Sequence, residues 1–100
     1  MLLALALSLV ADRTFATMAD KPVKWSATSS RPVAELSRCI TDNMPVVFQK
    51  KEDGENTVIA LFAAGQLMTT YTVVKTATGS VVERRGRPFV RKPVDQCLVA

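Results

Sequence analysis

The stretch TVIALFAAGQLMTTYTVVKTATGSVVERR, residues 57–85, decides the fold of this 100-residue chain. Three runs within it favour β-strands, because they are apolar throughout or rich in β-branched and aromatic residues. These runs are residues 57–64, residues 67–75 and residues 81–87. Turns around Gly65–Gln66 and around Gly79 separate them. Since short turns join antiparallel neighbours, the stretch predicts an antiparallel meander.

Upstream of this stretch, the pattern predicts one more strand. VVFQKK, residues 46–51, begins with an apolar run. The turn EDGEN, residues 52–56, follows it with Asp53–Gly54 as its pivot, a dipeptide that favours a hairpin. The meander is therefore expected to have three or four strands.

Before Pro45 the periodicity becomes helical. Three apolar residues fall on one helix face, with Cys39 beside them: Val33, Leu36 and Ile40. Ser30 is expected to cap the helix, and Asn43 is expected to end it in the left-handed conformation. One amphipathic helix is predicted over residues 31–43.

Together these elements predict one α+β domain over residues 30–100, with one N-terminal helix packed on a three- to four-stranded antiparallel meander. The helix has to cover one face of the sheet, because nothing else is available to do so. Residues 88–100, PFVRKPVDQCLVA, contain two prolines and are expected to form an edge segment or coil. Residues 20–29 lack periodicity and are expected to be a linker. Within them, Trp25 lies over the edge of the core or serves as an anchor for a partner.

The N-terminal residues 1–19 have the character of a secretory signal peptide. An apolar run over residues 2–11 is too short to cross a bilayer, and small residues allow cleavage after Ala16 or Ala19. The alternative is a buried N-terminal helix. A signal peptide predicts a periplasmic or secreted protein of roughly 80 residues without a transmembrane span, a size at which a single core is barely sufficient.

The two cysteines, Cys39 and Cys97, are expected to form a disulfide. Structural zinc normally needs four Cys or His ligands, and the chain has no histidine. A redox pair normally has the close spacing Cys-x-x-Cys, which is absent. A disulfide between them would close a loop of roughly 60 residues and stabilise the domain by about 4 kcal/mol on the chain-entropy model.

Several short motifs resemble a group of small proteobacterial exported proteins and lipoproteins. The motifs are PVAELSRCITDN, a hairpin with glycine, TVVKTATGSVVERR and a terminal Val-x-x-Cys-Leu, within residues 30–98. The positions that match are Ala34, Cys39, Ile40, Gly79, Ser80, Val94 and Cys97. No activity is assigned to that group, so the resemblance implies a fold and an exported location, without a catalytic residue.

Catalysis is not expected. Without histidine, the Ser/His/Asp and Cys/His arrangements are excluded, and the commonest general base is missing. No glycine-rich phosphate loop is present. The sequence therefore predicts a non-enzymatic protein without a metal or other cofactor.

A basic run, ERRGRPFVRK over residues 83–92, is the strongest charge signal in a chain of net charge +4. Its cations are candidates for an anion-binding site, because arginine forks suit phosphate and carboxylate groups: Arg84, Arg85, Arg87, Arg91 and Lys92. In the cell envelope, the natural anions are lipid headgroups, lipopolysaccharide phosphates and acidic proteins. Export argues against nucleic acid as the partner. The alternative is a solvated strand end that protects a sheet edge.

The alternation within residues 67–75 predicts a second surface. One face, expected to pack on the helix, carries Leu67, Thr69, Tyr71 and Val73, and the other carries Met68, Thr70, Thr72 and Val74. The second face would be solvated, or would bind an envelope protein or a second copy of the chain. The sequence thus predicts a non-catalytic binding or interaction module of the periplasm or cell envelope, with anion binding by the basic run as the alternative.

Overall fold

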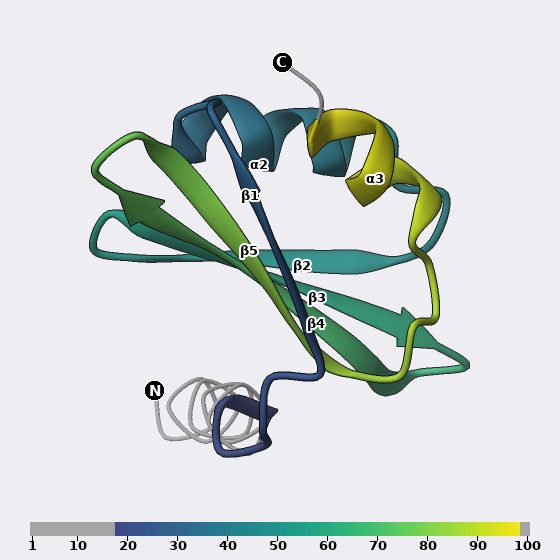
Figure 1. Ribbon diagram of the computed structural model, residues 1–100. Coiled ribbons are helices and arrows are strands. Elements are labelled where there is room, and N and C mark those ends of the chain that lie inside the picture. The colour runs from purple at the N-terminus through teal and green to yellow at the C-terminus, as the bar shows by residue number, and fades with distance from the viewer. Residues whose placement is uncertain (1–17, 99–100) are drawn as a thin grey trace, which may run out of the picture.

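The structure, a computed structural model, describes residues 18–98. Its strands form one antiparallel five-stranded sheet in the order β1-β5-β4-β3-β2, and both labelled helices lie over the same face of that sheet (Figure 1). The elements are β1 (Trp25–Ser29), α2 (Val33–Asp42), β2 (Phe48–Asp53), β3 (Asn56–Ala63), β4 (Gln66–Thr76), β5 (Gly79–Gly86) and α3 (Lys92–Leu98). Among residues 18–98, no helix is long and apolar enough to cross a membrane. Except for Met18 and Ala19, the predicted signal peptide lies outside the described residues.

The predicted strands form the centre and one edge of the sheet. β2, β3, β4 and β5 follow one another as antiparallel neighbours, which confirms the meander. Gly54 and Gly65 turn the chain with positive φ angles of 62° and 76°. A register shift between Leu61 and Phe62 interrupts the pairing of β3 with β4, so the predicted alternation does not continue to the start of β4.

The predicted fold class is wrong, because the sheet has five strands and two helices cover it. The first addition is β1, which lies within the predicted linker and pairs antiparallel with β5 from Trp25↔Arg84 to Ser29↔Ser80. An edge strand needs hydrogen bonds to one neighbour only. It can therefore form from a short polar segment that shows no hydrophobic run.

The second addition is α3, in the segment that was expected to be edge strand or coil. Pro93 lies in the first turn of this helix, where its missing N–H group would have had no intrahelical partner. The proline therefore starts a helix here instead of preventing one. Pro93, Val94 and Cys97 are the buried residues of α3.

Helix α2 confirms the predicted amphipathic face and corrects both of its ends. Leu36 and Ile40 are fully buried. The N-cap is Pro32, without a side-chain hydrogen bond, so Ser30 does not cap the helix. Asn43 has a φ of −105° and is not left-handed. Its side-chain amide instead donates to the Cys39 carbonyl oxygen at 2.8 Å, which satisfies a free carbonyl at the helix end.

The core lies between the sheet and the two helices. Its buried members come from both helices and from three strands: Leu36, Ile40, Ile59, Leu61, Tyr71, Val73, Val82, Val94 and Cys97. Trp25 is partly buried and packs against this cluster from the sheet edge, one of the two positions expected for it. The helix face of the sheet is therefore the apolar face, as expected for Tyr71 and Val73.

The opposite face of β4 is less open than expected. Thr70 is only 2% exposed, and Thr72 and Val74 are half-buried. The side chain of Arg85 lies over this face, with its Nη1 group 3.4 Å from the Thr72 hydroxyl oxygen. The predicted open, threonine-rich surface on this face of β4 is therefore wrong.

Candidate functional site

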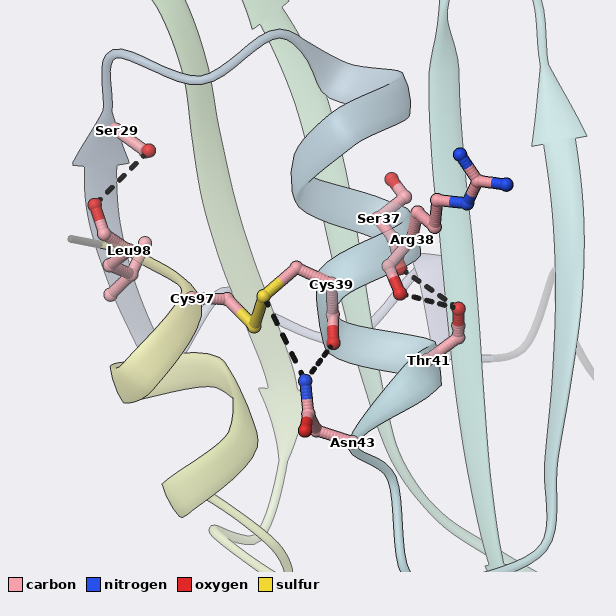
Figure 2. Close-up of a disulfide and its surroundings, with 8 residues drawn as sticks. All are labelled: Ser29, Ser37, Arg38, Cys39, Thr41, Asn43, Cys97 and Leu98. Atoms are coloured by element: carbon pink, nitrogen blue, oxygen red, sulfur yellow. Dashed lines mark hydrogen bonds between the residues drawn. A yellow bond between two sulfur atoms is a disulfide. The ribbon is translucent and has the colours of Figure 1, made fainter. Parts of the chain in front are cut away.

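The disulfide joins the two helices (Figure 2). Cys39 on α2 is bonded to Cys97 on α3, with their Cα atoms 5.8 Å apart and 58 positions apart in sequence. Cys97 is fully buried and belongs to the core cluster. The bond that the sequence predicts therefore braces both helices over the sheet.

Polar contacts fix the same region to the edge of the sheet. The Ser29 hydroxyl at the end of β1 donates to the Leu98 carbonyl oxygen at 3.2 Å (Figure 2). It also accepts the Arg31 backbone N–H at 3.1 Å. The Ser80 hydroxyl on β5 donates to the Arg31 carbonyl oxygen at 2.7 Å. The end of α3, the start of α2 and two neighbouring strands thus meet at one corner of the molecule, and the disulfide lies close to this corner.

The basic run does not form a single surface. Neighbouring residues on a strand point to opposite faces, so Arg84 and Arg85 on β5 are separated by the sheet itself. Arg85 faces away from the helices, where its Nε group donates to the Lys21 carbonyl oxygen at 3.1 Å. One of its terminal nitrogens lies 3.8 Å from the Glu83 carboxylate. These contacts tie Arg85 to the protein.

The two C-terminal cations of the predicted set lie at the start of α3. Arg91 is exposed, and its carbonyl oxygen accepts the Asp95 N–H at 3.0 Å, while Lys92 is exposed as the first residue of the helix. Of the five predicted residues, Arg84 and Arg87 line one groove, and Arg84 and Arg91 both act on the phenol of Tyr71.

Arg84 and Arg87 line a groove beside the start of β1 and the end of β5. These two strand ends lie next to each other in Figure 1. The groove has a volume of about 530 Å³. Its walls come from the chain that leads into β1, from the end of β5 and from the chain that leaves β5: Lys21, Pro22, Lys24, Arg84, Gly86, Arg87 and Pro88. Four of these residues are cationic and none is acidic. The groove is therefore suited to an anion.

Hydrogen bonds to backbone carbonyl groups hold the two walls of the groove in place. The Lys24 N–H donates to the Arg84 carbonyl oxygen at 2.8 Å, which extends the pairing of β1 with β5. On the other wall, the Thr69 hydroxyl donates to the Arg87 carbonyl oxygen. Gly86 has a φ of 91°, and a Cβ atom there would lie 2.7 Å from the Met68 carbonyl oxygen, so the chain leaves β5 by a path that only glycine permits.

A row of three residues crosses the sheet beside this groove. Trp25 on β1 pairs with Arg84 on β5, which pairs with Tyr71 on β4. The guanidinium carbon of Arg84 lies 5.9 Å from the centre of the Trp25 ring, a cation–π distance, and the Trp25 and Tyr71 rings meet edge to face at 6.5 Å. The three side chains therefore form one aromatic and cationic cluster on the helix face.

The Tyr71 phenol is held neutral in this cluster. Its hydroxyl donates to the Val90 carbonyl oxygen at 2.8 Å. Burial raises the pKa of Tyr71 above its ordinary value of 10.0. The charge of Arg84 and its side-chain interaction with the phenol, and the charge of Arg91, oppose part of that shift, whereas the carboxylate of Asp95 adds to it. Tyr71 thus orients its neighbours and supplies no negative charge to Arg84.

Sequence reasoning missed Lys21 and Lys24, because both lie in the segment interpreted as a linker. The signal that could have found them is the order Trp, Ser, Ala, Thr, Ser over residues 25–29, which alternates large or apolar with polar residues as an edge strand does. An antiparallel partner for that strand would have brought the two lysines beside the basic run.

Comparison with protein-family models, with curated protein sequences and with solved structures finds no match to this chain.

Proposed function

We propose that the protein is a non-catalytic binding module of the periplasm or cell envelope that binds phosphate-bearing surfaces through its cationic groove. The observation that carries this proposal is the convergence of Lys21, Lys24, Arg84 and Arg87 on one groove that no carboxylate lines. These residues come from two segments about sixty positions apart, so the fold, and not a local charge run, gathers them.

The extracytoplasmic location is part of the proposal. A disulfide persists in oxidising compartments, and the Cys39–Cys97 bond is of the structural kind, since Cys97 is fully buried. The apolar run at residues 2–11 and the resemblance of residues 30–98 to small exported proteins favour the same location. In the envelope, the abundant phosphate-bearing surfaces are the headgroups of lipids and of lipopolysaccharide.

The test is salt-dependent binding to vesicles that contain phosphatidylglycerol in phosphatidylcholine, measured by co-sedimentation. Each cation close to an anionic membrane contributes about 1 kcal/mol. The double variant Lys24→Gln/Arg87→Gln should therefore bind about 10- to 30-fold more weakly than the wild type at low salt.

The matched control is Arg38→Gln/Lys50→Gln, which removes the same charge from two exposed residues on α2 and β2, away from the groove. It should bind nearly as tightly as the wild type. If both double variants lose binding equally, net charge and not the groove is responsible. If the wild type does not bind, the proposal is wrong.

A further inference from the structure

Arg84 differs from the other cations of the groove because it is buried without a counterion. It is 8% exposed, and its Nε group is buried without a hydrogen-bond partner. Among residues 18–98, Arg84 takes part in no ion pair, unlike Lys75, which pairs with Glu55, and Arg85, which pairs with Glu83. Removing a cation from water without a counterion is costly, and a bound anion would reduce that cost.

The side chains that the structure describes next to Arg84 hold its guanidinium without an ion pair. Trp25 contacts it through an aromatic ring at 5.9 Å, and Tyr71, whose phenol is neutral, follows on the next strand. The aromatic neighbours restrict the motion of the guanidinium group. A guanidinium held in this way is preorganised for an oxyanion, because its N–H groups form a planar fork.

Arg84 also lines the cationic groove, and the other cations of the groove set the preference among anions. Arg84 is one wall of the groove, with Lys24 and Arg87 beside it and no carboxylate among the lining residues. Three further cations favour a dianion over a monoanion, because each additional negative charge gains attraction from all of them. We propose that Arg84 is the centre of a binding site for one tetrahedral dianion of the phosphate class, which enters through the groove.

This proposal rests on the proposed function in that both use the same groove, but it makes a separate claim about one phosphate group. Trp25 provides a direct readout, since it is the single tryptophan of the chain and lies beside the guanidinium. Full-length protein is titrated with inorganic phosphate, sulfate and acetate at constant ionic strength while the Trp25 emission is recorded. Phosphate and sulfate should cause a saturable change, and acetate should be at least about ten-fold weaker.

Two substitutions test whether Arg84 is responsible. Arg84→Met should stay folded, because it replaces a buried charge with an apolar chain about as long as the aliphatic stem of arginine, and it should lose the saturable response. Arg84→Lys keeps the charge but removes the planar fork, so it should bind phosphate at least about ten-fold more weakly. The second variant decides the question if the first does not fold.

The outcomes separate this proposal from the proposed function and separate the sources of phosphate. A response to free phosphate supports the proposal and assigns a soluble ligand. A response only to vesicles that carry phosphatidic acid supports it and assigns a headgroup. No response to either, or an unchanged response in Arg84→Lys, overturns the proposal, even if phosphatidylglycerol vesicles still bind through the groove.

Discussion

Reduction of the Cys39–Cys97 disulfide should lower the thermal midpoint of unfolding by a large amount. The bond joins residues 58 positions apart, and on the chain-entropy model a loop of this size stabilises the folded state by about 4 kcal/mol. For a domain of this size, 1 kcal/mol shifts the midpoint by about 4–8 °C. The expected decrease is therefore roughly 15–30 °C.

The structure also indicates where the loss should appear first. Helix α3 has seven residues, which is too few for a helix to be stable without tertiary contacts. Apart from the disulfide, it is held by its buried face and by the hydrogen bond from Ser29 to Leu98. After reduction, the amides of α3 should exchange with solvent faster than those of the central strands β3 and β4.

The assay is circular dichroism melting with and without reductant, together with hydrogen exchange followed by mass spectrometry. The variant Cys39→Ala/Cys97→Ala controls for effects of the reductant and should melt within a few degrees of the reduced wild type. Intact mass after thiol labelling should find two reactive thiols only after reduction. If the oxidised and reduced proteins melt within about 3 °C of each other, the disulfide does not stabilise the fold and the reasoning is wrong.

Two further predictions concern the sheet. Gly79→Ala should destabilise the protein by about 2–3 kcal/mol or more in chemical denaturation, because its Cβ would lie 2.3 Å from the Ser29 carbonyl oxygen. Gly54→Ala is the control, since nothing lies within 4 Å of its added Cβ and only the φ of +62° opposes it, at about 1 kcal/mol; equal losses would contradict the close approach. Stability should also fall as the pH rises above about 10. Burial raises the pKa of Tyr71 in the folded state, so the neutral phenol stabilises the fold fully at pH values below its unfolded-state pKa. That contribution is lost as the pH rises through the folded-state pKa. The decrease should be steeper than in Tyr71→Phe, and absorbance of the phenolate follows the chain's single tyrosine; equal slopes would show that Tyr71 is not responsible.

The parts of the fold that the sequence predicts are those encoded by local patterns. β3 and β4 are long and rich in apolar or β-branched residues, and α2 places Leu36 and Ile40 at helical spacing on one face. The disulfide could also be predicted, because other uses of two distant cysteines need ligands that the chain lacks. These features depend on nearby residues or on simple chemical exclusion.

β1 and α3 could not be predicted in the same way, because their formation depends on distant partners. β1 pairs with β5, more than fifty positions later, and only Trp25 gives it a large apolar side chain. α3 is short, contains a proline and gains its stability from contact with α2 and from Cys97. A proline in a sequence therefore does not by itself exclude a helix, since a proline is tolerated in the first turn of a helix.

The separation of Arg84 from Arg85 could be predicted from the alternation of side chains along a strand. Once residues 81–87 are predicted as a strand, Arg84 and Arg85 must point to opposite faces, so a single patch that contains both is inconsistent with the strand. The same alternation assigns Arg84 to the face of Val82, which packs in the core. What alternation cannot reveal is that Lys21 and Lys24 lie beside Arg84 and Arg87, because that requires the pairing of β1 with β5.

Arg84 is a charged residue at a strand position where the pattern of core residues calls for an apolar side chain. The row across the sheet that contains Ile59 and Tyr71 is part of the core, and continuing that row onto β5 calls for another apolar side chain. An arginine there is costly, and an apolar side chain such as methionine would fit the core better. Sequences that specify a fold depart from their pattern mainly at functional positions. If Arg84 binds an anion, one role explains both its buried charge and the cationic groove that it lines. If Arg84 served only to stack on Trp25, its buried Nε group would have no hydrogen-bond partner.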